Sequence, residues 1–381
     1  MRFFQFTGNY LSNRFGELVN LRTEKYDPLK SKNHFPCIEL ENIEQESCIL
    51  NSLFDSIEQK SIKTKFKKGD ILFGKLRPYL KKYIQVDFDG VCSTEIWVMN
   101  SNFLLNRYVF YYIQTNRFLT IANTSSGTKM PRAEWSLIRA SIIKYPNSIE
   151  EMQVVSKFLS LIDQRIETQS KIIEKIKLFK NIISDHLLYS NQLSEFINLS
   201  YYATLKNGYT FKSSEYDSNG IYNVITIANV TGERYIDIVG CNKINAIPQD
   251  IQEHQQLKNN NILISLTGNV GRVSLCNKNN CLLNQRVGVL EIKNDNYNEF
   301  IFQCLSNKHF EKTMILKGQG VAQLNISKKD VENFKIPKIS LDKLNQICNI
   351  LNFLDKKIAI EKEIYNDYHQ MKKYLLLNMF I

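Results

Sequence analysis

Residues 69–83, GDILFGKLRPYLKKY, place a glycine-lysine step directly after an apolar run. Such a step can cradle the phosphates of a nucleotide or contact the backbone of a nucleic acid. A nucleotide-binding P-loop requires G-x-x-x-x-G-K-[ST], in which the last hydroxyl holds magnesium. Gly69, Gly74 and Lys75 fit this spacing, but Leu76 follows and offers no oxygen. The next residues, Arg-Pro, also start a helix poorly. Two interpretations of this segment remain: a loop that contacts a nucleic acid, or a solvated basic turn.

A second pair with possible chemistry is Glu291 and Lys293, in the E-x-K spacing of some nucleases. There the acid binds a metal and the lysine orients the attacking water. No acidic residue precedes Glu291 within about 35 positions, and an amphipathic strand produces the same alternation. A nuclease therefore stays as the lesser alternative. A methyltransferase is not indicated, because the chain lacks a glycine-rich cofactor loop and an Asn-Pro-Pro-Tyr-like motif.

Cysteine and histidine spacing gives no metal or cofactor signal. The eight cysteines form no C-x-x-C pair, and the five histidines never pair at H-x-x-H or H-x-x-x-H spacing. Cys276 and Cys281 are close enough in sequence to meet across a turn. We expect reduced thiols in a cytoplasmic protein and no bound cofactor.

Composition favours a polyanionic partner. The 381 residues carry a net charge of +11 and are 43% hydrophobic, which predicts well-packed globular domains. No apolar run approaches the roughly 18 residues of a membrane span. The N-terminus lacks the continuous apolar core of a signal peptide. We therefore expect no membrane association.

The chain repeats itself at a shift of 191 residues. GDILFGKL (69–76) falls on NNILISLT (260–267), and VCSTE (91–95) falls on LLNQR (282–286). GTKMPRAEW (127–135) then falls near GVAQLNISK (320–328), and Pro146 falls on Pro337. The order of features is kept: strand, Gly-containing turn, second strand with a polar tip, Gly loop, amphipathic stretch and proline.

The repeat is strongest in two long stretches with heptad spacing, at a shift of 192. Residues 158–180 overlie 350–372, and even the polar interruptions coincide, Gln169 with Glu361 and Lys180 with Lys372. A 3-4 pattern over four or five heptads predicts a coiled-coil helix of about 40 residues in each copy. Pairing the two helices antiparallel buries both seams, with Gln169 near Glu361 to fix the register. The apolar rows are Met152, Leu159, Ile166, Ile173 and Leu187 with Val155, Ile162, Ile176 and Ile183, and Leu344, Leu351, Ile358, Tyr365 and Met379 with Ile347, Leu354, Tyr368 and Leu375.

These patterns divide the chain into four segments: 1–148, 149–190, 191–338 and 339–381. The globular segments carry net charges of +7 and +3, whereas the helices carry 0 and +1. The positive charge therefore lies on the globular segments. Nine basic residues and one acid lie between Lys60 and Lys82, interleaved with Tyr79. This pattern favours a loop that contacts phosphates.

The ordered set of motifs resembles type I restriction-modification specificity subunits over essentially the whole chain. GDILFGKLRPYLKKY and SSGTKMPRAEW before a long helix resemble the first half. GYTFKSSEY (208–216), NILISLTGNVGRV (261–273), LLNQRVGVL (282–290) and QLNIS (323–327) resemble the second. FGELVNL begins at Phe15, earlier than in other members, so the opening strand of the first domain is expected to be abbreviated.

The resemblance implies an α+β fold with two target recognition domains, 1–148 and 191–338. Two antiparallel spacer helices, 149–190 and 339–381, would hold them apart with pseudo-twofold symmetry. Each domain would read one half of a split, asymmetric site in double-stranded DNA. The subunit itself would perform no chemistry. It would dock two methyltransferase subunits, and motor-endonuclease subunits would complete the complex. A stand-alone DNA-binding protein or a coiled-coil scaffold is the alternative.

The residues expected to contact DNA lie in the loops after the repeated strands. Asn and Gln pair bidentately with adenine and Arg with guanine, while Lys and Arg neutralise phosphates. Arg286 is equally suited to a structural ion pair. The predicted residues are Lys75, Arg77, Tyr79, Lys81, Lys129 and Arg132 in the first domain and Thr267, Asn269, Arg272, Gln285, Arg286, Gln319 and Gln323 in the second.

Overall fold

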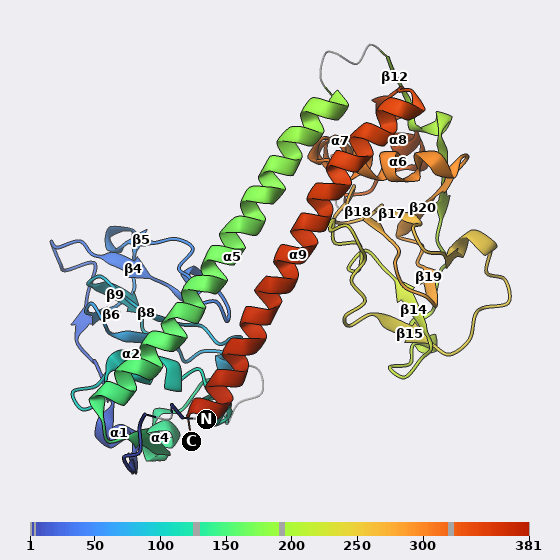
Figure 1. Ribbon diagram of the computed structural model, residues 1–381. Helices are drawn as coiled ribbons and strands as arrows, with labels where there is room; N and C mark the ends of the chain where they lie inside the picture. The colour runs from blue at the N-terminus through green and yellow to red at the C-terminus, as the bar shows by residue number, and fades with distance from the viewer. Residues whose placement is uncertain (1, 4, 125–129, 190–194, 319–323, 381) are drawn as a thin grey trace. The chain divides into compact units, whose positions relative to one another are not determined.

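The computed structural model describes the chain except residues 1, 4, 125–129, 190–194, 319–323 and 381. It divides into two compact units (Figure 1). Unit 1 comprises residues 1–170 and 364–381, and unit 2 comprises residues 171–363. Two long helices, α5 (Ile149–Tyr189) and α9 (Leu341–Met379), each contribute one segment to each unit.

The globular part of unit 1 is built on three sheets. A four-stranded sheet has the order β2-β10-β7-β8, a five-stranded sheet has the order β3-β6-β9-β4-β5, and β1 pairs with β11. Four short helices complete it. The elements are β1 (Tyr10–Arg14), α1 (Phe15–Leu18), β2 (Asn20–Leu21), β3 (Lys25–Tyr26), β4 (Pro36–Ile38), β5 (Phe54–Asp55), β6 (Lys63–Phe66), β7 (Ile71–Gly74), β8 (Tyr83–Gln85), β9 (Gly90–Ser93), β10 (Ile96–Asn100), α2 (Asn106–Tyr112), α3 (Asn116–Ala122), α4 (Trp135–Ala140) and β11 (Ile142–Pro146).

Unit 2 has a matching set of sheets. Their orders are β13-β20-β17-β18, β15-β14-β19-β16 and β12-β21. The elements are β12 (Phe196–Asn198), β13 (Ala203–Asn207), β14 (Tyr222–Ile225), β15 (Asn242–Ile244), β16 (Gln256–Leu257), β17 (Ile262–Ser265), β18 (Val273–Leu275), β19 (Cys281–Leu283), β20 (Val287–Ile292), α6 (Asn298–Leu305), α7 (Lys308–Gly318), α8 (Lys328–Glu332) and β21 (Lys335–Pro337).

The structure confirms the internal repeat. The segments 69–76 and 260–267 form β7 and β17 at the same place in equivalent sheets. In both units a single parallel strand pair, β4 with β9 and β14 with β19, interrupts otherwise antiparallel pairing among the described strands. Pro146 and Pro337 both end the last strand of their globular part.

The expectation of an abbreviated opening strand was wrong. β1 pairs with β11 over five residues, from Tyr10–Pro146 to Arg14–Ile142. Its counterpart β12 pairs with β21 over three. β1 has five residues because Tyr10–Arg14, the segment directly before FGELVNL, is itself extended.

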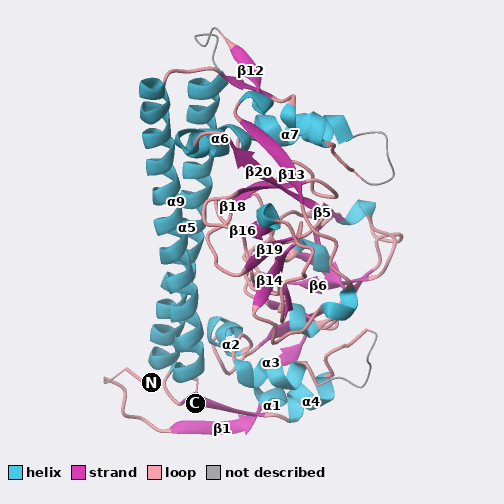
Figure 2. Cartoon of the chain, turned by 90° about the vertical axis from the view of Figure 1, so that its right-hand side faces the viewer, coloured by secondary structure: helices cyan, strands magenta, loops and turns pink. Residues whose placement is uncertain are grey.

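Within each unit, the segments of α5 and α9 lie side by side and run in opposite directions (Figures 1 and 2). Most of the predicted heptad positions are buried, including Leu159 and Leu351, which are fully inaccessible. Each such side chain contributes about 1.5–3 kcal/mol through burial. One detail differs: the fully buried residue at the end of α5 is Leu188, and Leu187 is only half-buried. The heptad register shifts there because the helix end packs on the core of unit 2.

The short helices α2 and α6 lie between the long helices and the sheets of their own units (Figure 2). α2 is buried from Tyr108 to Tyr112, and α6 from Phe300 to Leu305. Each therefore joins one globular part to its helix segments. No helix in the described part of the chain is long and apolar enough to cross a membrane.

Candidate nucleic-acid interface

In unit 1, the loop after β7 is built against a second loop that is distant in sequence. The backbone N–H of Arg77 donates to the carbonyl of Pro131 at 2.8 Å. Leu76 forms an antiparallel bridge with Arg132. We call residues 75–81 and 130–132 the first loop pair. Arg77 is held in the left-handed conformation, with a φ of 51°, so that Pro78 can begin a short 3-10 helix.

Exposed polar side chains cover the first loop pair. Lys75 and Arg77 make no side-chain hydrogen bond or ion pair with any described residue, and Arg77 is exposed. Tyr79 is half exposed, which suits stacking or a phosphate contact. Lys81 forms an ion pair with Glu46, and Arg132 Nε lies 3.0 Å from Glu95 Oε2. Lys75 and Arg77 are therefore the cations most available to a phosphate.

In unit 2, the loop from Leu266 to Arg272 joins β17 to β18. Gly268 and Gly271 adopt positive φ angles of 72° and 78°, which L side chains rarely adopt. The Gly268 N–H donates to Leu324 at 2.9 Å, and Thr267 bridges Asn325. We call residues 266–272 and 324–325 the second loop pair. Asn269 at its tip is exposed, and Arg272 Nε lies 3.8 Å from the Glu311 carboxylate.

The turn between β19 and β20 brings Gln285 and Arg286 to the second loop pair. The N–H of Leu266 donates to the Arg286 carbonyl at 3.0 Å. Gln285 Oε1 accepts a hydrogen bond from Thr210 at 2.5 Å. Arg286 is exposed, and its guanidinium has no hydrogen-bond or ion-pair partner among the described residues. Its backbone is therefore fixed, and its side chain does not form, with any described residue, the structural ion pair considered from the sequence.

The two loop pairs share one hydrogen-bond scaffold. In each, the residue after the strand donates its N–H to the turn before the neighbouring strand, and its carbonyl accepts from the second loop. The equivalent bonds are Lys75 N–H to Glu95 and Leu266 N–H to Arg286, Ala133 N–H to Lys75 and Ile326 N–H to Leu266, and Arg77 N–H to Pro131 and Gly268 N–H to Leu324. The backbone is repeated, whereas the polar tips differ.

The structure thus brings the described members of each predicted residue set together within their own unit. Lys129, Gln319 and Gln323 lie outside the described residues. Five partners of the described members were not predicted from the sequence: Glu46, Glu95, Thr210, Glu311 and Asn325. A signal existed for Glu95, because the 191-residue shift places it on Arg286. Asn325 lies in the QLNIS motif, two residues after the predicted Gln323. No sequence pattern indicated Glu46, Thr210 or Glu311.

The E-x-K pair has structural partners. The Lys293 ammonium donates to the carbonyls of Ser200 and Tyr201 at 2.8 and 3.1 Å. Glu291 lies 3.3 Å from Lys206 on the neighbouring strand β13. No cluster of three metal-ligating side chains occurs among the described residues. Both side chains are therefore engaged by neighbouring groups of the protein.

Cys276 and Cys281 do meet across the turn between β18 and β19. A hydrogen bond from Cys281 lowers the pKa of the Cys276 thiol, against the opposing effect of burial. All eight cysteines are free. Both cysteines pack in the apolar cluster that contains Leu263 of β17.

Comparison with known proteins agrees with this geometry. The family model described as "Type I restriction modification DNA specificity domain" matches residues 12–178 and again 191–367. The specificity subunit of the type I restriction enzyme MjaVIII from Methanocaldococcus jannaschii is 24% identical over 300 residues, covering 71% of this chain and 68% of that protein. The specificity subunit of the Escherichia coli enzyme EcoDI is 31% identical over 98 residues, or 26% of this chain and 22% of that one.

Solved structures show the same fold. A chain from a structure on assembly and conformational transition of the type I restriction-modification system matches with a TM-score of 0.59 and 19% identity, covering 97% of this chain and 98% of that one. The S subunit from M. genitalium matches with a TM-score of 0.58 and 16% identity, covering 98% and 96%. The chain therefore belongs to the type I restriction-modification DNA specificity family, carries the family's domain twice, and is a DNA-recognition specificity subunit.

Proposed function

We propose that each unit reads one half of a split, asymmetric duplex site through its own loop pair. The observation that carries this proposal is the repeated hydrogen-bond scaffold with different polar tips. A shared backbone presents both loop pairs to DNA in the same way. Different side chains on that backbone then select different bases. The net charge of +11 supports binding to the phosphate backbone.

Within each loop pair we assign different roles to different side chains. Lys75 and Arg77 position the first unit on phosphates, because neither engages a carboxylate. Asn269 and Arg286 are the best candidates for base edges in the second unit, since both are exposed at its tip. Lys81, Arg132 and Arg272 have acidic partners, which must be exchanged for phosphate before they contribute.

We further propose that the chain supplies recognition and docking, while two methyltransferase subunits and the motor-endonuclease subunits supply the chemistry. Four segments, 1–148, 149–190, 191–338 and 339–381, divide these roles. The globular segments read DNA, and the helices receive the partners. A cytoplasmic location, where these components would meet, is part of the proposal.

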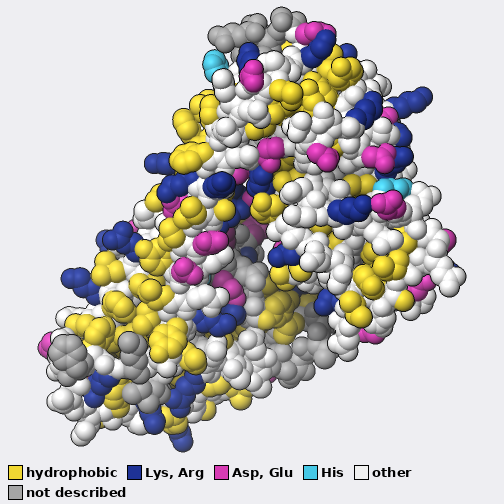
Figure 3. Space-filling model, turned by 45° about the vertical axis from the view of Figure 1, so that its right-hand side comes forward, with side chains coloured by type: hydrophobic (Ala, Val, Ile, Leu, Met, Phe, Trp, Pro, Cys, Tyr) yellow, Lys and Arg dark blue, Asp and Glu magenta, His cyan; other side chains and the backbone are white. Residues whose placement is uncertain are grey.

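Exposed apolar side chains on the long helices support docking of two similar partners. They recur at equivalent positions of the 192-residue repeat, and Figure 3 shows hydrophobic side chains interspersed with Lys and Arg on one face of the molecule. In unit 2 two of them, Phe179 and Phe353, line one apolar groove. Isolated apolar residues on a surface need no explanation, but a repeated set indicates a protein interface. The equivalent pairs are Leu161 and Phe353, Ile172 and Ile364, Phe179 and Met371, and Ile182 and Tyr374; the groove is lined by Phe179, Ile183, Asn349, Ile350, Phe353 and Leu354.

Methylome sequencing of cells with and without the gene tests the proposed function. We expect deletion to abolish methylation at one split motif and to leave other motifs unchanged. Restoring the gene from a plasmid should restore the same motif. If methylation is identical in all three strains while the methyltransferase is present, the chain does not direct methylation.

A docking variant separates recognition from assembly. Phe353→Ser should reduce co-purification with the methyltransferase because it removes the most exposed aromatic side chain of the apolar groove, at 68% exposure. DNA binding by the purified chain should be retained. A matched control is Phe103→Ser, which removes an equally exposed phenylalanine, 66%, from a loop outside the helices. Equal loss of methyltransferase in both variants would contradict docking at the groove.

A further inference from the structure

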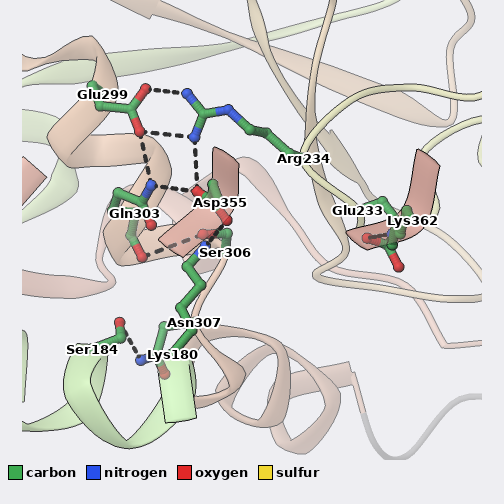
Figure 4. A network of polar contacts seen from close by, with 10 residues as sticks. All are labelled: Lys180, Ser184, Glu233, Arg234, Glu299, Gln303, Ser306, Asn307, Asp355 and Lys362. Carbon is green, nitrogen blue, oxygen red and sulfur yellow. Dashed lines mark hydrogen bonds and ion pairs between the residues drawn. The ribbon is translucent and has the colours of Figure 1, made fainter. Parts of the chain in front are cut away.

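Asp355 of α9 connects three parts of unit 2 at one buried carboxylate (Figure 4). Its side chain is 9% exposed. Oδ1 lies 2.5 Å from Lys180 Nζ of α5. Oδ2 accepts hydrogen bonds from Arg234 Nη1 at 2.9 Å and Gln303 Nε2 at 2.8 Å. The carboxylate therefore ties both helix segments to the recognition domain.

The domain side of this contact is itself held in place. Glu299 accepts two bonds from the Arg234 guanidinium, at 2.9 and 2.6 Å, and one from Gln303 at 2.8 Å. The guanidinium also lies 5.0 Å from the centre of the Phe302 ring. Burial acts to lower the pKa of Arg234, but Glu299 and Asp355 outweigh it and raise the pKa, so the cation is retained. The negative charges of Glu299 and Asp355 therefore match the positive charges of Lys180 and Arg234.

Unit 1 repeats the arrangement around Asp163 of α5. The 192-residue shift relates Asp163 to Asp355 and Lys372 to Lys180. Asp163 Oδ1 lies 2.7 Å from Lys372 Nζ of α9, and Oδ2 accepts from the Tyr111 hydroxyl at 2.8 Å. Tyr111 on α2 occupies the position of Gln303 on α6. Each oxygen therefore has the same task in both units: Oδ1 binds the opposite helix, and Oδ2 binds the domain.

Stability alone does not account for this repetition. Burying charges costs several kcal/mol per ion in desolvation, so buried ion pairs are a weak source of stability, although losing one partner is costly. The apolar clusters already join α2 and α6 to the helices in each unit. An apolar contact tolerates sliding, whereas a carboxylate bound on both oxygens has one favourable arrangement.

We propose that Asp163 and Asp355 are positioning residues that hold each recognition domain in one orientation on its own helix segments. This inference rests on the proposed function, because the orientation of each domain then determines where its loop pair meets DNA. Neither aspartate needs to touch DNA. Their loss should affect how strictly the chain measures the distance between half-sites, and not which bases each half-site contains.

The orientation can be measured without DNA. Spin labels attached through non-canonical amino acids at Lys356 of α9 and Asn279 of the β18–β19 turn report one distance within unit 2; both positions are exposed. The wild-type chain should give a narrow distance distribution. Asp355→Asn should at least double its width, because it removes the charge that Lys180 and Arg234 share. A width equal to wild type would overturn the proposal.

Spacing discrimination gives the functional readout. The probes are duplexes carrying the split motif found by methylome sequencing, with its natural spacer or with one base pair added or removed. For wild type we expect at least tenfold weaker binding to the altered spacers. Asp355→Asn should reduce this ratio about threefold or more, while binding to a single half-site stays within twofold of wild type. An unchanged ratio would also overturn the proposal.

Two further variants keep the outcome interpretable. Tyr111→Phe removes one hydrogen bond from Asp163 without unpairing a charge, so it retains the fold and should lower the ratio in the same direction by a smaller factor. Glu253→Gln removes an exposed ion pair with Lys258 from the recognition domain that Asp355 contacts, and should match wild type in both assays. If wild type itself shows no spacing dependence, the proposed function fails rather than the positioning role.

Discussion

At the scale of single residues, Arg77 has an unusual backbone for its side chain. Its φ of 51° lies in the left-handed region, and its repeat-equivalent residue is Gly268, with a φ of 72°. A non-glycine residue pays roughly 1–2 kcal/mol for this conformation. An exposed arginine at a backbone position that suits glycine indicates a functional role for its guanidinium.

Arg77→Gly is therefore a clean test of DNA contact. The loop should keep its conformation, with thermal stability equal to or above wild type, because glycine fits the left-handed region. Affinity for the duplex should fall about 5- to 20-fold, and the slope of log affinity against log salt should decrease by about 1. Lys144→Ala, which removes an exposed charge from β11, should have little effect. Equal affinity for Arg77→Gly and wild type would remove Arg77 from the interface.

His369 of α9 makes stability depend on pH. Burial and the nearby Lys372 lower its pKa from the usual 6.5, against the opposing charges of Asp163 and Glu46. Its Nε2 is buried without a hydrogen-bond partner among the described residues. The unfolded chain therefore binds this proton at higher pH than the folded chain does, and stability falls as pH drops through 6.5 toward the lower, folded pKa.

His369→Gln should remove this component of acid sensitivity. The melting temperature of wild type should fall between pH 7.5 and 5.5, and the variant should lose of order 1 °C less over the same interval. Differential scanning calorimetry at matched ionic strength measures both. If the two proteins lose the same amount, the half-buried imidazole of His369 does not contribute to the pH dependence.

At the scale of elements, a glycine fixes how the second loop pair meets α7. Gly271 has a φ of 78°, and a Cβ there would lie 2.8 Å from Met314 Cβ and 3.1 Å from Glu311 Cα. Gly271→Ala should therefore combine backbone strain with a clash. Gly240 has a φ of 68°, and a Cβ added there would meet nothing within 4 Å, so Gly240→Ala carries the strain alone.

The difference between these two variants isolates the clash. We expect the free energy of unfolding to fall about 2 kcal/mol further in Gly271→Ala than in Gly240→Ala. Urea denaturation provides the comparison, and duplex binding should weaken only for Gly271→Ala. Equal destabilisation would show that α7 moves aside at little cost.

Local elements were predictable where the pattern that encodes them is short-range. The strands before both loop pairs and the two long helices follow from apolar runs, Gly-Pro punctuation and heptads, and the repeat placed them in order. Side-chain partners were not predictable in this way. Glu46 and Glu95 reach Lys81 and Arg132 only through tertiary packing. The donors to Asp163 and Asp355 are a tyrosine and a glutamine, which share no sequence signature.

The register of the two helices remains our proposal. Gln169 and Glu361 are repeat-equivalent and both buried, at 7% exposure. We expect cysteines substituted at these two positions to form a disulfide under mild oxidation, in a background without exposed native thiols. Cysteines placed at Asp163 and Lys372, whose side chains pair in unit 1, serve as the working control. Failure of Gln169 with Glu361 beside success of the control would contradict the register.

At the scale of the whole molecule, the two loop pairs belong to different units and share no side chain, hydrogen bond or apolar cluster among the described residues. Substitutions in independent sites usually add to within about 0.5 kcal/mol. Arg77→Gly should weaken duplex binding without changing the bases that are read, because Arg77 is assigned to phosphates. Arg286→Ala should relax the half of the split motif that unit 2 reads.

Methylome sequencing of the two single variants and the double variant measures this independence. Arg286→Ala should relax one half of the motif, whereas Arg77→Gly should lower methylation without changing the motif. The free-energy losses for duplex binding should sum in the double variant to within about 0.5 kcal/mol. Lys144→Ala combined with either variant should reproduce that single variant. A coupling above about 1 kcal/mol, or relaxation of both half-sites by Arg286→Ala alone, would mean that the units do not read DNA independently. The asymmetric site would then reflect one composite surface instead of two domains that share a scaffold and differ at its polar tips.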